Sequence, residues 1–414
     1  MKKIILVLII FTMVAGGAFA DFTISGLLGA GATLLKGSSQ DDSNLYSGGF
    51  IFGRLQAELN YEDTVGALFR VKLGNDFSPY AWGWWKPVQQ VKFQLGFIDD
   101  FNADYIVGWE FHYNDAEDYN ITSDTPDCWH SGRVFHRSTG FYSGFWGNGA
   151  AATFKPASWL ALNIAVPFKI GDMLNQDGLS DYNAKNSYKY TVAQAVYTIS
   201  ETGMFTVTFT GGGHELYRND YSYPDKNNVT VYESEYIVYP PHTLFASFLF
   251  TALENINMNF GVEYPFQFKG SGVNCQFPMA AGFGISYETG KFGIKTRIAA
   301  AFAGTTWLKN ETIIEPVKFG FGIMPSYDFD VCRLYLNTGI SFTDKGKYVT
   351  FNYYDMVNKT DDAAIGWHIN PYVRKIIGPA SLFAGFRLES DGIKNADGKI
   401  VIHWGIPIAI QVEF

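Results

Sequence analysis

The sequence lacks three features that would each place it in a common class of protein. Outside the N-terminus it has no run of 18 apolar residues, so no segment is typical of a transmembrane helix. It has only three cysteines among 414 residues, which excludes a disulfide-rich scaffold. Charged residues make up only 17% of the chain and its formal net charge is −9, which argues against nucleic acid as a partner. An aromatic content of 17% excludes a disordered chain.

The three cysteines, Cys128, Cys275 and Cys332, are interpreted as independent thiols. Cys128 and Cys275 both fall in segments expected outside the membrane. A bridge between these two is an open alternative, because pairing cannot be deduced from sequence.

The N-terminus has the pattern of a secretory leader. Lys2 and Lys3 precede an apolar core over residues 4–11, and Ala18-Phe19-Ala20 forms an A-x-A cleavage site. The core is too short to span a bilayer as a helix. We therefore predict a cleaved signal peptide over residues 1–20 and an exported transmembrane β-barrel over residues 21–414. Without a transmembrane helix, a barrel is the remaining way to span a membrane, because a closed sheet leaves no backbone hydrogen bond unpaired.

The last sixteen residues show the pattern that recurs through the chain. Every even position from Ile400 to Phe414 is apolar, whereas the odd positions are mostly small or polar. A period of two predicts a strand with one apolar and one polar face. Similar alternation predicts about 18 strands (16–18), over residues 22–34, 49–61, 65–73, 91–97, 105–113, 141–154, 160–168, 188–198, 204–210, 244–252, 256–266, 281–287, 292–302, 317–323, 332–342, 365–373, 382–388 and 399–414.

The predicted links alternate between short and long. Short periplasmic turns, long extracellular loops and an even strand number are typical of outer-membrane barrels. The fold class is therefore predicted to be all-β: a single closed transmembrane antiparallel up-and-down barrel. Prolines conflict with this pattern, because a closed barrel has no free edge for them. We expect Pro265 and Pro325 at strand ends, and bulges at Pro371 and Pro407.

The leader, the alternating strands, the loop asymmetry and the terminal Gln411-Val412-Glu413-Phe414 together resemble porin-like outer-membrane proteins of diderm bacteria. The resemblance implies location in outer-membrane lipid and an encounter with periplasmic chaperones. It also implies that the barrel-assembly machinery reads the last strand through Ile410, Val412 and Phe414. It selects no substrate, and leaves open whether three barrels associate.

The polar face of the predicted strands would line a pore, and bases outnumber acids on it. The predicted pore-lining residues are Arg54, Arg70, Lys92, Glu110, Lys295, Arg297, Lys318, Arg333, Arg374 and Arg387, with Lys72, Glu58, Glu263, Glu389 and Glu413 also on this face. Rings of Arg and Lys favour anions. The alternative is that these side chains only hold water and pair with each other.

Two further features have less specific interpretations. A Trp-rich loop with Trp84 and Trp85 is predicted to join an aromatic girdle, with a sugar-stacking platform as the alternative. No nucleophile elbow, H-E-x-x-H motif or calcium loop occurs, so we predict no enzyme, cofactor or metal site.

The sequence thus favours a channel for passive diffusion of small hydrophilic solutes. The alternatives are a surface adhesin or receptor, suggested by aromatic loops at 80–85 and 211–242, and a hydrophobic-solute transporter. Such transporters usually carry an N-terminal plug, whereas here the strand pattern begins at Phe22.

Overall fold

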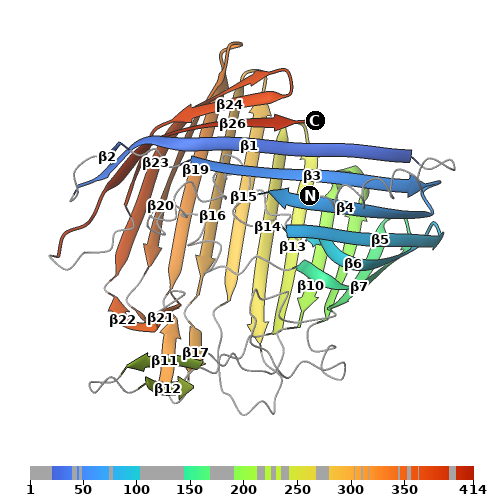
Figure 1. The fold of residues 1–414 in the computed structure, drawn as a ribbon, viewed down its shortest axis with the longest axis horizontal. Helices are drawn as coiled ribbons and strands as arrows, with labels where there is room; N and C mark the ends of the chain where they lie inside the picture. The colour runs from blue at the N-terminus through green and yellow to red at the C-terminus, as the bar shows by residue number, and fades with distance from the viewer. Residues whose placement is uncertain are drawn as a thin grey trace.

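The chain folds into one large antiparallel barrel (Figure 1). The computed structural model describes residues 21–39, 44–45, 49–73, 78–102, 144–167, 191–211, 220–224, 230–234, 242–266, 279–302, 304–308, 311–315, 317–343, 346–351, 356–361, 363–390 and 398–414. The predicted leader, the predicted strand at 105–113, Cys128 and Cys275 lie outside these residues. In the described part of the chain, no helix is long and apolar enough to cross a bilayer.

The main sheet contains 20 strand segments, of which β2 (Asn44–Leu45) only continues the β1–β3 pairing along the far end of β1. β24 (Ala380–Gly385) and β25 (Arg387–Ser390) both pair with β23 and β26, so together they form one strand of the wall. This leaves 18 strands, as predicted. The others are β1 (Asp21–Ser38), β3 (Gly49–Tyr61), β4 (Val65–Leu73), β5 (Ser78–Val88), β6 (Val91–Asn102), β7 (Gly144–Ala157), β8 (Leu160–Pro167), β9 (Val192–Ile199), β10 (Gly203–Thr210), β13 (His242–Leu253), β14 (Ile256–Phe266), β15 (Ala280–Thr289), β16 (Phe292–Ala301), β19 (Lys318–Asp328), β20 (Arg333–Thr343), β23 (Ala364–Ile377) and β26 (His403–Glu413).

The barrel closes where the first strand meets the last. β1 pairs with β3 on one side and with β26 on the other (Figure 1). At this seam the Gly26 N–H donates to the Phe414 carbonyl at 2.7 Å, and the Phe414 N–H donates to the Gly26 carbonyl at 3.0 Å. The Phe414 ring covers Gly26 so closely that a Cβ there would lie 2.4 Å from a ring carbon. Closure pairs the edges that an open sheet would expose to lipid.

One end of the barrel, here called the turn end, is built from short links. The links β3–β4, β5–β6, β7–β8, β9–β10, β13–β14, β15–β16, β19–β20 and β23–β24 have two to four residues. Residues in the left-handed region make these turns tight, including Glu62 (φ 47°), Asp63 (φ 54°) and Asn255 (φ 63°). The links at the opposite end, the loop end, have up to 41 residues, so the predicted asymmetry is confirmed.

Small hairpins add to the loop end. β11 (Asp220–Pro224) pairs with β12 (Thr230–Ser234), and a second sheet combines β17 (Gly304–Leu308), β18 (Glu311–Glu315), β21 (Gly346–Phe351) and β22 (Met356–Asp361). Figure 1 shows them beyond the rim of the barrel. None of these hairpins was predicted from the sequence.

Alternation along the strands gives the barrel two faces. Directly opposed residues share a face, so one face can be followed from Glu413 through Leu27 to Arg54 and onward around the wall. The other face carries apolar side chains that stay exposed although they are large, such as Ile164 at 47% and Ile410 at 41%. Apolar side chains of this kind belong against lipid, so this is the outer face. It includes the even positions of β26, as predicted.

Aromatic side chains surround the turn end of the outer face. Exposed members are Tyr61, Trp85, Trp159, Tyr197, Tyr287, Phe292, Tyr327, Phe329 and Phe414. Such a girdle marks a membrane interface. Trp85 joins it and stacks on Phe93, with ring centroids 5.9 Å apart. The prediction that Trp84 and Trp85 lie in a loop is wrong: residues 78–88 form β5.

Two local features depart from the predicted pattern. Alternation in the predicted strand at 91–97 puts Phe97 on the apolar face with Phe93 and Leu95, yet Phe97 is buried. Its ring centroid lies 4.1 Å from that of Tyr80, which is opposite Arg70. Gly96, with φ 117°, interrupts the alternation just before Phe97. β6 also pairs directly with β7, so no strand separates them in the wall, contrary to the prediction at 105–113.

The prolines are accommodated in different ways. Pro265 lies at the end of β14, as predicted, whereas Pro325 lies inside β19. A register shift in β1 follows the residue opposite Pro407, which confirms a bulge there. Pro371 keeps a regular register with β20, and also with β24 and β25, between which the Phe386 N–H donates to the Pro371 carbonyl at 2.9 Å. The bulge expected within β23 is therefore wrong.

Candidate functional site: the polar inner wall

The predicted pore-lining residues gather on the inner face. The register puts nine of the ten at inner-facing positions, and Glu110 lies outside the described residues. The nine are Arg54, Arg70, Lys92, Lys295, Arg297, Lys318, Arg333, Arg374 and Arg387. Lys72, Glu58, Glu263, Glu389 and Glu413 share this face.

One group of bases is supported by amide and aromatic side chains on β3 to β6. Arg70 donates from Nε and Nη2 to Gln56 Oε1 at 3.0 and 2.8 Å, and its guanidinium lies 5.2 Å from the Trp82 ring centroid. Lys92 lies 5.9 Å from the centroid of the Trp84 ring. These contacts fix the direction of long side chains that would otherwise be mobile, and they leave the positive charges in place.

A second group consists of two arginines directly opposite each other on β20 and β23, Arg333 and Arg374. Arg333 donates from Nε and Nη2 to Ser326 Oγ on β19 at 3.3 and 3.0 Å. Arg374 donates in the same way to Ser381 Oγ on β24, also at 3.3 and 3.0 Å. The guanidiniums thus lean apart, which reduces the repulsion that two like charges in opposed positions cause. Arg333 also forms an ion pair with Glu288 at 2.5 Å.

Toward the loop end, the inner wall has buried polar side chains. His368 Nε2 lies 3.1 Å from Asn337 Oδ1, and both residues are buried. Arg387 and Glu389, two residues apart on β25, are only 5% and 2% exposed. Buried charges need compensation, and this pair provides opposite signs at short range. Among the described side chains of β23 and β25, the charged groups in this part of the wall are therefore buried.

Histidines flank Glu389 in the register, with His368 on β23 on one side and His403 on β26 on the other. Such a row contains the residue types of a metal site. Among the described residues, however, no group of three His, Cys, Asp or Glu side chains converges closely enough to hold an ion. The geometry therefore assigns no metal to this row.

Comparison with known proteins adds information on the fold alone. No family model matches the chain, and no curated protein matches it. Among solved structures, OpdL of Pseudomonas aeruginosa is 9% identical with a TM-score of 0.51, and the match covers 95% of this chain and 99% of that one. OccK10 (OpdN) of the same organism is 10% identical with a TM-score of 0.51, over 94% and 99% of the two chains. The fold is that of an outer-membrane β-barrel.

For an outer-membrane barrel, the two faces have separate roles. The outer face meets the hydrocarbon of the bacterial outer membrane, and the inner face is left for water and solutes. Barrels of 16–18 strands are wide enough to leave an aqueous channel. The inner wall is therefore the candidate functional site.

Some acids on this wall were not predicted from the sequence. Glu288 and Asp328 occupy inner-facing positions at the turn ends of β15 and β19, opposite Gly293 and Arg333. The predicted strands ended one and five residues too early, so both acids were omitted. Continuing the alternation past Tyr287 would have found Glu288. With these acids included, the excess of bases over acids on the inner face is smaller than the sequence indicated.

Proposed function

We propose that this chain forms an outer-membrane channel through which small hydrophilic solutes diffuse passively. The observation that carries the proposal is the inner face: inside a closed 18-strand wall, the register puts charged residues such as Arg54, Arg70 and Arg374 on one continuous face, between aromatic and small residues. A wall of this kind stabilises water, and water-filled barrels conduct ions and small solutes.

Conductance in planar bilayers tests this proposal. Purified, folded protein should produce stepwise increases in current, whereas heat-unfolded protein should produce none. If well-folded barrels insert into the bilayer and carry no ion current, the channel proposal is wrong.

We further propose a mild preference for anions. The support is the set of inner-facing bases, above all Arg54, Arg70, Lys92 and Arg374, which outnumber the inner-facing acids among the described residues. Such positive charges raise the local concentration of anions. The reversal potential across a KCl gradient reads the sign directly, and a cation-selective value would refute the preference.

Two alternatives have less support. A surface adhesin or receptor was suggested by aromatic loops, yet the first of these, at residues 80–85, is part of β5 in the wall. A hydrophobic-solute transporter is the other alternative, but residues 21–38 form β1, which pairs with both neighbours in the wall and is therefore not part of a plug.

Assembly is a separate proposal. Ile410, Val412 and Phe414 lie on the outer face of β26, and Ile410 and Phe414 are 41% and 57% exposed. Their side chains are thus placed where a barrel-assembly machine could read them. Association of three barrels through the outer face stays a prediction, which the mass of the folded protein in detergent would test.

A further inference from the structure

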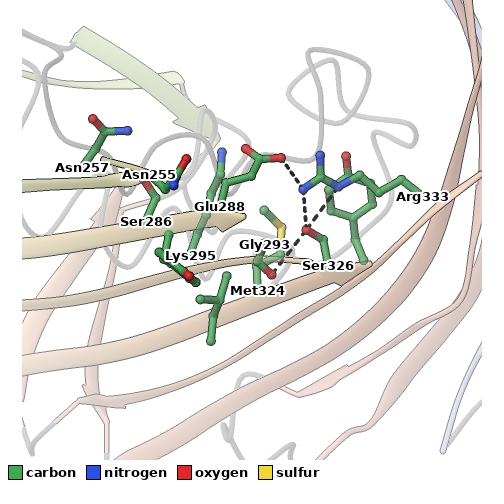
Figure 2. A pocket seen from close by; sticks show the side chains of 12 residues that line it. Asn255, Asn257, Ser286, Glu288, Gly293, Lys295, Met324, Ser326 and Arg333 are labelled. Carbon is green, nitrogen blue, oxygen red and sulfur yellow. Dashed lines mark hydrogen bonds and ion pairs between the residues drawn. The ribbon is translucent and has the colours of Figure 1, made fainter. Parts of the chain in front are cut away.

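A polar pocket lies on the inner wall near the turn end, where β14, β15, β16, β19 and β20 run side by side (Figure 2). Its volume of about 410 Å³ falls within the range of roughly 300–1,000 Å³ that is typical of small-molecule sites. Both charged and uncharged polar side chains line it, including Asn255, Asn257, Ser286, Glu288, Lys295 and Arg333.

Lys295 and Arg333 are the cations that line the pocket, and the charge of Arg333 is compensated. Arg333 Nη2 lies 2.5 Å from Glu288 Oε1, and the same guanidinium donates to Ser326 Oγ, as the dashed lines in Figure 2 show. The guanidinium fits over Gly293, where a Cβ would lie 2.7 Å from Nη2. Arg333 is therefore held rigidly with its charge balanced, which makes it a poor receptor for a free anion.

The uncharged side chains stand on the other side of the pocket. Asn257 is directly opposite Ser286, and the Asn255 carbonyl accepts from the Glu288 N–H at 3.0 Å, which ties the β13–β14 turn to β15. Each amide offers both donors and an acceptor, and each hydroxyl offers both roles. Glu288 remains 59% exposed while bonded to Arg333, so its carboxylate also faces the pocket.

This arrangement suits hydroxyl groups better than ionic groups. A vicinal diol donates and accepts at neighbouring positions. An amide can match both roles at once, and a carboxylate can accept from both hydroxyl groups. We propose that the pocket binds a small, uncharged, polyhydroxylated solute of monosaccharide size as it passes the turn end of the barrel. The proposal rests on the channel function proposed above and names a solute class for it. Binding is expected to be weak, because a solute in a channel must also leave.

Ligand-observed NMR on the folded barrel in detergent tests binding without requiring conduction. Glucose is the probe, and glucuronate is the matched anionic probe. Glucose should bind, and Asn257→Ala should weaken its binding by about fivefold to tenfold, the loss expected for one hydrogen-bonding partner. Ser286→Ala should act in the same direction. Asn163→Ala is the matched control, because this inner-wall amide bonds Gln194 far from the pocket and its removal should leave glucose binding unchanged.

Glu288→Gln separates the two solute classes. It removes the charge that balances Arg333, so glucuronate binding should appear or strengthen while glucose binding falls. Wild-type protein that prefers glucuronate, or glucose binding unaffected by both Asn257→Ala and Ser286→Ala, would overturn the proposal. Current measured on the same preparations tests the channel proposal separately. Glucose binding without current would refute the channel proposal but not the proposal that the pocket binds glucose.

Discussion

Arg374 provides the sharpest test of which face of the wall meets the pore. Its guanidinium is fixed on the inner face by two hydrogen bonds to Ser381 and lies 5.5 Å from the Phe383 ring centroid. Lys375, the next residue, is exposed and occupies the opposite face of β23. Arg374→Ala and Lys375→Ala therefore remove the same charge from adjacent residues on opposite faces.

The size of the effect follows from Coulomb's law. At roughly 8 Å from a permeating ion in water, one unit charge contributes about 0.5 kcal/mol. Screening in 0.1 M salt roughly halves this value. Because removing the charge disfavours anions and favours cations equally, the anion-to-cation permeability ratio should fall by about twofold in Arg374→Ala. Lys375→Ala should leave the ratio unchanged.

The assay is the reversal potential of single channels across a KCl gradient, repeated at high salt, where the difference between variants should shrink. Equal shifts in both variants would show that alternation does not separate pore from lipid here. A shift in Lys375→Ala alone would mean that the inner and outer faces have been exchanged.

Two other substitutions test the wall itself, through urea unfolding from lipid vesicles. Gly26→Leu should lower the free energy of unfolding by about 1–3 kcal/mol, because the new side chain must displace the Phe414 ring from the seam; unchanged stability would mean that this contact is dispensable. Ile164→Arg should cost about 2–4 kcal/mol, because it puts a charge against lipid near the middle of β8. Its neighbour Asn163→Arg, on the inner face, should cost far less, and equal costs would contradict the assigned faces.

The period-two pattern predicted much of the wall. The bounds of β3 and β4 agree with the predicted strands at both ends, and the even residues of β26 face outward as expected. These strands have polar residues mainly on the face toward the lumen and apolar residues on the face toward lipid, so apolar and polar residues alternate clearly in the sequence.

Prediction failed where the inner wall is not polar. In β5, Trp82 and Trp84 face inward and Trp85 faces outward, so aromatic side chains occur on both faces and hide the alternation. Gly96 caused a second failure, because a left-handed residue inside a strand changes the direction of the side chains that follow.

The contacts between distant residues were also beyond prediction. Arg333 and Arg374 were both assigned to the inner face, but their direct opposition depends on the register between β20 and β23, which a 20-residue link separates. The pocket needs the register of five strands at once. Sequence alternation specifies faces, whereas register across long loops depends on packing and turn geometry.

The seam between β1 and β26 has a consequence for biogenesis. β1 can close the barrel only by pairing with β26, so a nascent chain that lacks β26 cannot complete the ring. The two outermost strands of such a chain would have unpaired backbone amides. A polypeptide in that state could neither enter hydrocarbon nor remain safely in water, where exposed edges promote aggregation. Export of this protein therefore calls for a holding step that lasts until its final residues have been delivered.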